Sequence, residues 1–425
     1  MDDHKRVASS DPSAASIAST NDATRERKPM VVFPDEVADI GVTLCSYQRA
    51  AVLTDKMPPA DLSTPILGLF GEVGSVVAAV KKKRRDTAAY VSYGRTLREE
   101  LGDVLWYFCA IASRAGLDLS ILAQRVSRML NDWDQVEQDE FGSFDDLQSM
   151  TTVASEDLAL AAMTQLATRT SDLVYDLHKD RLRDNRDAIS AHLVFILRAL
   201  IAVADAMEVS LQEAAEDNLR KVFSRWPIER RYPPRIDIGL PLNERLPSRF
   251  TVFIEEHTIN GKTYVLQKRN GVIIGDRLTD NKGEKDDYRF HDVFHVAYAV
   301  HLGWSPVLRA LFRVKRKSHP NLDETEDGSR AVLTEEGIAT FVFGRALERD
   351  LFADLEHLDY DLLKLVSDLV RGFEPEGCML WQWERAILDG FRVFRDLKRH
   401  RRGYVKADLD AHTLVFEPGL DKEYD

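Results

Sequence analysis

The sequence predicts a mainly α fold: two related helical-bundle units, the second of them degenerate, followed by a smaller α+β domain. Three observations support this fold class. Apolar residues recur at helical spacing from Ile66 to Trp133. A similar pattern returns from about residue 156 to Trp226, so that both units end at a tryptophan. Short strand-like segments bounded by Asn-Gly pairs, which are typical of hairpins, appear after residue 250.

Length and composition are those of a multidomain globular protein. The 425 residues suggest two or three domains, and 44% apolar and 30% charged residues are ordinary values for that class. The net charge of −13 argues against broad binding to nucleic acid, because an acidic surface is repelled by a phosphate backbone. Cys45, Cys109 and Cys378 lack metal-binding spacing and fit a reducing compartment.

No secretory or membrane-spanning segment is predicted. No signal peptide is visible. The most apolar run, Leu193 to Ala206, is interrupted by Arg198 and Asp205 and is too short to cross a bilayer. We therefore expect a cytoplasmic protein without a membrane partner.

Two acidic segments stand inside the first helical unit. Glu72 lies in Gly71–Ser75, and Glu100 and Asp103 lie in Glu99–Asp103, each among core-type apolar residues. Glu100 and Asp103 are three residues apart, so on a helix both carboxylates project from one face. Carboxylates among core-facing residues need a compensating partner, and no buried basic residue stands close by in sequence. A hard dication, Mg²⁺ or Mn²⁺, bound by oxygens on facing helices is the simplest explanation.

These segments resemble the MazG-like, all-α nucleoside triphosphate pyrophosphohydrolases. The resemblance rests on Gly68–Gly74 and on Glu99–Tyr107, and it covers about a quarter of the chain closely. The family motif is Glu-x-x-Glu, a spacer and Glu-x-x-Asp, and its four side chains bind magnesium. By this resemblance, Glu72, Glu100 and Asp103 would be catalytic metal ligands.

Ser75 stands where the family has its second Glu, so one negative charge is missing. The resemblance therefore implies one of two functions. The first is a Mg²⁺-dependent enzyme that cleaves a nucleoside triphosphate to the monophosphate and pyrophosphate; the second is a catalytically weakened nucleotide sensor. In the enzyme, Glu99 would orient the attacking water or simply face solvent, and Trp106 would stack on the base or fill the core. A homodimer is compatible with either alternative.

The first unit is expected over residues 35–135, between a disordered tail at 1–34 and an acidic linker at 136–155. Its first helix begins near Thr43 and ends before Pro58. Five consecutive cations follow the first acidic segment at a helix C-terminus, where they suit the helix dipole. Of these, Lys81 and Lys82 would bind the triphosphate tail of the nucleotide; a solvated helix end is the alternative.

The second unit, at 156–226, has lost the metal carboxylates. When its end is aligned with the end of the first unit, Glu100 corresponds to Ser190 and Asp103 to Leu193. Its last helix keeps three polar residues on one face: Asn218, Lys221 and Arg225. They are similar to residues that contact phosphates in the family, and an ordinary amphipathic helix is the alternative. We expect the two units to pack as a pseudo-dimer, because each alone would leave a helical face uncovered.

The rest of the chain divides into a Pro-rich linker at 227–249 and an α+β domain of unknown function at 250–425. Three short strands joined by Asn-Gly turns are expected at Phe250–Ile254, Lys262–Leu266 and Gly271–Ile274. Four aromatic residues at helical spacing predict a buried helix face: Trp381, Trp383, Phe391 and Phe394.

A second group of polar residues stands in this domain. His291, Asp292 and His295 place two histidines at i and i+4, and Glu335 and Glu336 open another helix about 40 residues later. Zinc hydrolases use this spacing with Glu in the middle, and Asp292 has a shorter reach. Three alternatives stay open: a metal-dependent hydrolase with a regulatory first half of the chain, another metal or phosphate site, and polar packing.

Overall fold

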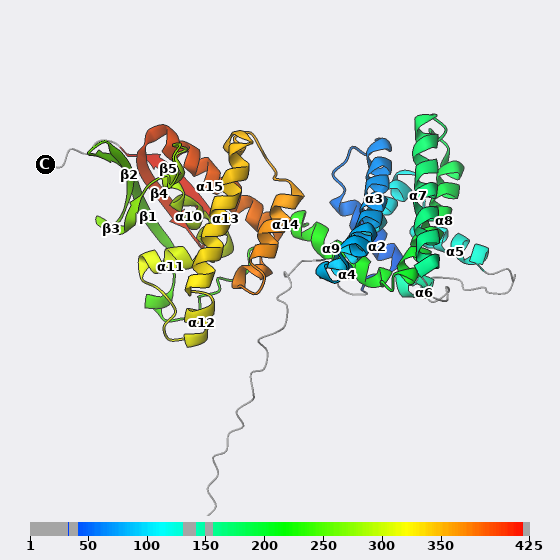
Figure 1. The fold of residues 1–425 in the computed structure, drawn as a ribbon, viewed down its shortest axis with the longest axis horizontal. Helices are drawn as coiled ribbons and strands as arrows, with labels where there is room; N and C mark the ends of the chain where they lie inside the picture. Colours follow the sequence, from blue (N-terminus) through cyan, green and yellow to red (C-terminus); the bar gives the residue numbers. More distant parts are fainter. Residues whose placement is uncertain (1–32, 34–40, 131–141, 149–155, 420–425) are drawn as a thin grey trace, which may run out of the picture.

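The computed structural model describes residues 33, 41–130, 142–148 and 156–419. It contains an all-α part and an α+β part that lie side by side (Figure 1). Each has its own hydrophobic core, the first built from residues between Leu44 and Phe223 and the second from residues between Leu246 and Leu414. The fold class is therefore as predicted, mainly α with an α+β C-terminal part. Apart from residue 33, the expected tail at 1–34 lies outside the described residues, as does most of the acidic linker at 136–155.

The all-α part consists of eight α-helices and one 3₁₀ helix among the described residues. They are α2 (Leu44–Thr54), α3 (Ser63–Asp86), η1 (Thr87–Ala89), α4 (Tyr93–Arg114), α5 (Leu119–Leu130), α6 (Phe144–Gln148), α7 (Glu156–His178), α8 (Arg186–Ala206) and α9 (Leu211–Arg225).

Local signals set the ends of several of these helices. Thr43 and Ser46 form a capping box that starts α2, and the Ser210 hydroxyl accepts from the backbone N–H of Glu213 at 3.1 Å to start α9. Gly116 follows α4 with a φ of +62°, a conformation that glycine adopts without a steric cost. The start of α2 matches the sequence expectation of a helix that begins near Thr43.

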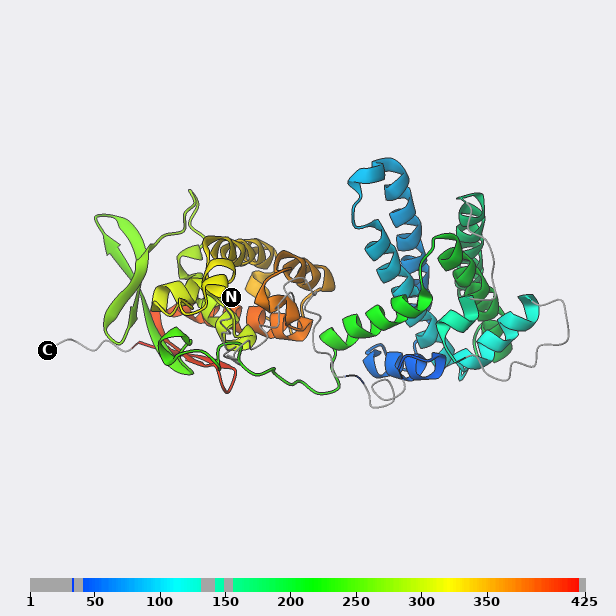
Figure 2. The same cartoon turned by 90° about the horizontal axis from the view of Figure 1, so that it is seen from below.

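The helices form two hairpins that exchange their last helices. α3 packs on α4 and α7 packs on α8, and the two hairpins meet where α3 contacts α7. The helix after each hairpin then crosses to the other one: α5 packs on α8, and α9 packs on α4. This exchange brings residues of α9 to the helix that carries Glu100 and Asp103. At its far end α9 leads toward the C-terminal part (Figure 2).

Among the described residues, two helices are long and apolar enough to cross a membrane by length and composition alone: Ser63–Ala89, which joins α3 and η1, and Arg186–Ala206, which is α8. A third candidate arises if α4 and α5, bent by 105°, count as one span. The apolar run at Leu193 to Ala206 is therefore part of a longer helix than the sequence analysis considered, because this helix begins at Arg186. In the fold, 39% of the apolar window in the first helix and 61% of that in α8 are buried against other parts of the protein.

A five-stranded antiparallel sheet with the order β3-β2-β1-β4-β5 forms the end of the C-terminal part remote from the helical bundle (Figure 1). Its strands are β1 (Arg249–Ile259), β2 (Lys262–Arg269), β3 (Val272–Leu278), β4 (Arg402–Asp408) and β5 (Thr413–Pro418). The two Asn-Gly turns are as predicted, since Asn260, Gly261, Asn270 and Gly271 all have positive φ. The sequence did not predict β4 and β5.

Helices cover the sheet and fill the space between it and the bundle. They are η2 (Leu242–Glu244), η3 (Tyr288–Phe290), α10 (Asp292–Leu302), α11 (Pro306–Phe312), α12 (Pro320–Thr325), α13 (Ser329–Leu347), η4 (Asp350–Phe352), α14 (Tyr360–Leu369), η5 (Glu374–Gly377) and α15 (Leu380–His400). The central pair is α10 and α15. The aromatic residues predicted to be core on α15 are all buried.

Part of the predicted linker at 227–249 packs on this second core. Asp237 is 1% exposed and receives an N–H from Arg309 at 2.9 Å, and Leu246 is also buried. An ion pair this deeply buried fixes the segment in place rather than leaving it extended in solvent.

Candidate active site

Three carboxylates converge in the all-α part. Glu72 comes from α3, and Glu100 and Asp103 come from successive turns of α4. One oxygen from each lies within 4.8 Å of the other two, and all three residues are half-buried. Their proximity follows from the packing of α3 on α4, and it brings together the residues that the sequence spacing selected.

Burial and mutual repulsion both disfavour the ionised forms of the three carboxylates. Burial, together with the neighbouring charges of Asp103 and Glu100, raises the pKa of Glu72 to about 7. Burial and Asp103 likewise raise the pKa of Glu100. Burial also raises the pKa of Asp103, although Lys221 opposes it. These raised pKa values mean that the protein does not fully compensate the negative charge of the three carboxylates, and a bound dication would compensate it.

α9 supplies polar partners for Asp103. The Asn218 amide donates to Asp103 Oδ1 at 2.8 Å, and the Lys221 ammonium hydrogen-bonds both Asp103 oxygens. The Tyr47 hydroxyl donates to Asn218 Oδ1 at 3.1 Å, which fixes the orientation of the amide. Asn218 and Lys221, predicted from the resemblance of the last helix, therefore lie beside the carboxylates.

The approach of α9 depends on Gly102. A Cβ at this position would meet the carbonyl oxygen of Ala214 at 2.7 Å and Cβ of Asn218 at 2.9 Å. Backbone atoms cannot yield as a flexible side chain can, so the glycine of the Glu-Leu-Gly-Asp segment lets α4 and α9 pack closely enough for Asn218 to reach Asp103.

Glu99 faces the C-terminal part rather than solvent. The Tyr360 hydroxyl on α14 donates to Glu99 Oε1 at 2.9 Å, and the Lys364 ammonium hydrogen-bonds Glu99 Oε2. Burial alone would raise the pKa of Glu99, but Lys221 and Lys364 outweigh it and lower the pKa. Tyr360 and Lys364 were missed by the sequence analysis, because nothing in the local pattern of α14 marks them as partners of a residue 261 and 265 positions earlier.

Other predicted nucleotide contacts lie elsewhere. Lys81 and Lys82 are exposed near the C-terminal end of α3, about three helical turns beyond Glu72, and Lys82 lies over the ring of Tyr90. Arg225 donates to the carbonyl oxygen of Leu358 at 2.7 Å, so it binds the C-terminal part and not the carboxylates.

Trp106 and Ser75 flank the carboxylates. Trp106 is half-buried, and its Nε1 donates to the Thr54 hydroxyl at 2.9 Å, a contact that fits the core alternative. Ser75 is half-buried one turn after Glu72 on α3, the place where a fourth carboxylate would join the group.

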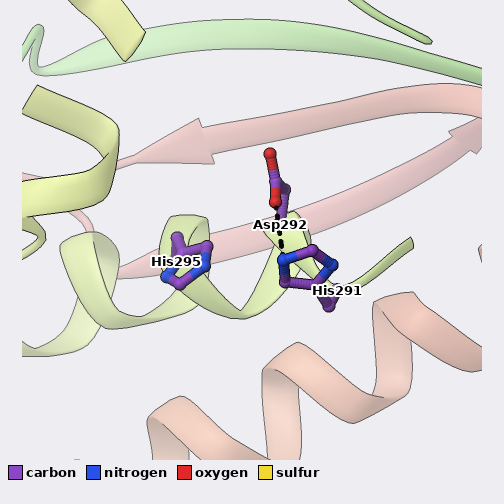
Figure 3. A group of neighbouring side chains, drawn as sticks. All are labelled: His291, Asp292 and His295. Carbon is purple, nitrogen blue, oxygen red and sulfur yellow. Dashed lines mark ion pairs between the residues drawn. The ribbon is translucent and has the colours of Figure 1, made fainter. Parts of the chain in front are cut away.

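A second group of potential metal ligands lies in the C-terminal part. His291, Asp292 and His295 are buried at the start of α10, and one donor atom of each lies within 4.8 Å of the others (Figure 3). Glu335 and Glu336 of α13 face this group, and both contact His295. Burial alone would lower the pKa of His295, but these carboxylates outweigh it and raise the pKa, so the position attracts positive charge.

Comparisons with known proteins agree with this organisation. The model of the MazG nucleotide pyrophosphohydrolase domain matches residues 61–132, which include all three carboxylates of the first group, and the model of the MazG C-terminal domain matches residues 231–419. The Gene 37 protein of Mycobacterium phage L5 is 38% identical over 88 residues, which span 19% of this chain and 77% of the phage protein. No solved structure gives a significant match. The chain belongs to the MazG nucleotide pyrophosphohydrolase family.

Proposed function

We propose that this protein hydrolyses a nucleoside or deoxynucleoside triphosphate to the monophosphate and pyrophosphate, with Mg²⁺ held by Glu72, Glu100 and Asp103. The observation that carries the proposal is the convergence of these carboxylates from α3 and α4. Their oxygens are the hard donors that Mg²⁺ prefers, and Mn²⁺ would fit the same set. When bound, the ion would neutralise phosphate oxygens and lower the pKa of an attacking water.

The surrounding cations suit a triphosphate. Lys221 of α9 and Lys364 of α14 both lie beside Glu99. The Lys221 ammonium is 3.8 Å from Glu99 Oε1, and the Lys364 ammonium donates a hydrogen bond to Glu99 Oε2. Both would stabilise charge that develops on the phosphates as the bond breaks. Glu99 would position these cations, rather than face solvent or hold the water alone.

A panel of nucleoside and deoxynucleoside triphosphates, incubated with Mg²⁺ and assayed for pyrophosphate, tests the proposal and identifies the preferred base and sugar. Asp103→Asn should reduce turnover at least about 100-fold, because it removes a charged metal ligand. Asp86→Asn, the same exchange at the exposed end of α3, should leave turnover unchanged. An Asp103→Asn protein that retains full turnover would overturn the proposal.

The second candidate function is a nucleotide sensor that passes its state to the C-terminal part. Two observations favour it: Ser75 leaves the carboxylate group one charge short, and Tyr360 and Lys364 couple α14 directly to Glu99. A sensor would bind nucleotide with Mg²⁺ but release no pyrophosphate. Calorimetric binding without turnover across the whole panel would therefore support this alternative.

We also expect the protein to act in the cytoplasm. α3 carries Glu72 within its apolar window, and a carboxylate at the centre of a bilayer would be costly. A homodimer is supported by an exposed apolar stripe on α3, formed by Leu67, Phe70 and Val77. Light scattering of the purified chain would determine the oligomeric state, and separation of cell lysate into membrane and soluble fractions would test the location.

A further inference from the structure

The polar group at the start of α10 brings together donor atoms from two helices. His291 Nε2 lies 3.1 Å from Asp292 Oδ1 and 3.6 Å from Glu336 Oε2, and His295 Nε2 lies 3.4 Å from Glu336 Oε1. Ligands at about 2.0–2.2 Å from a tetrahedral zinc ion are separated from one another by about 3.3–3.6 Å. Two of the three separations, 3.4 and 3.6 Å, fall in this range, and the third, 3.1 Å, is slightly shorter.

The remaining atoms of these side chains are each held by another group. Nδ1 of His291 lies 2.9 Å from the carbonyl oxygen of Tyr288, and Nδ1 of His295 lies 2.9 Å from Glu335 Oε1. The second oxygen of Asp292 accepts a hydrogen bond from the Gln267 amide. Histidines that bind metals usually donate the other ring N–H to a carboxylate or carbonyl oxygen in this way, which fixes the tautomer and points Nε2 at the ion.

Glu335 is in turn fixed by the fold, so it acts as a support and not as a ligand. It is fully buried, and its second oxygen accepts the backbone N–H of Val307 at 2.9 Å. With Nδ1 donating to this carboxylate, Nε2 of His295 is left pointing at acceptor oxygens. The nitrogen is completely buried and makes no hydrogen bond with any described residue, although Glu336 lies near. Either a proton or a metal ion between Nε2 of His295 and Glu336 would satisfy both groups.

We propose that His291, Asp292 and His295 bind a divalent transition-metal ion beside Glu336, with zinc the ion that this donor set suits. Two imidazoles and one carboxylate select zinc over magnesium, which takes oxygen ligands almost exclusively. The charges of the Asp292 ligand and the neighbouring Glu336 carboxylate together match the charge of the ion.

The site is built on one side of a cavity of about 630 Å³, and His291 and Glu336 form part of its wall. Lys282, Tyr288 and Phe343 line the same cavity. Metal sites that adjoin a cavity can keep a coordination position for water or substrate, whereas purely structural zinc sites are closed by four protein ligands. This inference does not depend on the proposed pyrophosphohydrolase activity, since it concerns different residues and a different class of metal.

Metal stoichiometry of the full chain tests the inference. The protein is dialysed against a chelator, loaded with zinc in the presence of excess Mg²⁺, desalted and analysed by elemental mass spectrometry. Wild type and Asp103→Asn should both retain about one zinc per chain, because the Asp103 site lies in the other core. His291→Ala should lose the zinc, and Glu336→Gln should weaken zinc binding about 10- to 100-fold in a competition titration with a chromogenic chelator.

Two controls keep the result interpretable. Glu336 is 37% exposed, so Glu336→Gln should fold even if His291→Ala does not, and circular dichroism checks this. His257→Gln changes a partly exposed histidine that also pairs with a carboxylate, Glu255, and should keep the zinc. Zinc that stays bound at wild-type affinity in both His291→Ala and Glu336→Gln, or that is lost in Asp103→Asn, would overturn the inference.

Discussion

Proton competition at Glu72 gives a quantitative prediction for metal binding. With a pKa of about 7, Glu72 is about nine-tenths ionised at pH 8 and about one-tenth ionised at pH 6 in the metal-free protein. Glu100 and Asp103 on α4 hold this pKa up and Lys221 on α9 holds it down, with burial as the largest cause. Since Mg²⁺ binds the ionised carboxylate, its apparent affinity should be about tenfold weaker at pH 6 than at pH 8.

The pH dependence of folding stability gives a second prediction, which also has the larger effect of Mg²⁺ at the higher pH. A carboxyl whose pKa in the folded protein is raised from 4.5 to about 7 stabilises the metal-free fold below pH 4.5 and loses that contribution as the pH rises through 7. Mg²⁺ bound to the ionised group restores stability. The increase in Tm on addition of a fixed concentration of Mg²⁺ should therefore be larger at pH 8 than at pH 6.

Isothermal titration calorimetry with Mg²⁺ at pH 6, 7 and 8 measures the affinity directly, and differential scanning fluorimetry measures Tm under the same conditions. Glu72→Gln removes the titrating carboxyl, so this variant should bind more weakly and show a much smaller pH dependence. An affinity that is equal at pH 6 and pH 8 in the wild type, or a pH dependence that survives unchanged in Glu72→Gln, would refute the reasoning.

Two further substitutions test the geometry around this site. Ser75→Glu adds a fourth carboxylate one turn after Glu72, so it should lower Tm without metal and tighten Mg²⁺ binding about tenfold. The control Ser75→Ala should change neither Tm nor affinity. Equal affinities of the two variants in calorimetry would show that position 75 does not face the ion. Gly102→Ala places a Cβ 2.7 Å from the Ala214 carbonyl oxygen and should reduce the free energy of unfolding by about 1–3 kcal/mol in a denaturant titration, and an unchanged value would mean that α4 and α9 are not in close contact.

Local sequence signals predicted the parts of the fold and site that depend on local chemistry. The Asn-Gly pairs at 260–261 and 270–271 gave the correct hairpin turns, because these residues tolerate the positive φ that the turns require. The spacing of Glu100 and Asp103 placed both on one helix face, and the apolar residues around Glu72 indicated a helix packed against it.

What the sequence did not predict depends on contacts between distant segments. β4 and β5 are short strands after a long helix, and β4 becomes part of the sheet only by pairing with β1, more than 140 residues earlier. Glu99 was expected either to orient the attacking water or to face solvent, and it does not face solvent, because α14 supplies Tyr360 and Lys364 from the other part of the chain. Neither outcome leaves a periodic signal in the segments concerned.

The position of Lys221 connects metal binding to nucleotide binding. The Lys221 ammonium hydrogen-bonds both oxygens of Asp103, so it would compete with a dication for the same ligand atoms. A doubly charged ion attracts a carboxylate more strongly than a single ammonium does and would displace it, while the neutral Asn218 amide can keep its bond to Asp103. Lys221 would then be free to bind the phosphates.

Lys221→Met separates these two roles. Removing the competitor should tighten Mg²⁺ binding in the absence of nucleotide, and removing the cation should lower the rate of pyrophosphate release from a bound triphosphate by about tenfold or more. The two effects have opposite signs, so a general loss of structure cannot produce both. If Lys221→Met weakened Mg²⁺ binding, the ammonium would be a support for the metal site rather than its competitor, and the exchange between Asp103 and phosphate would be ruled out.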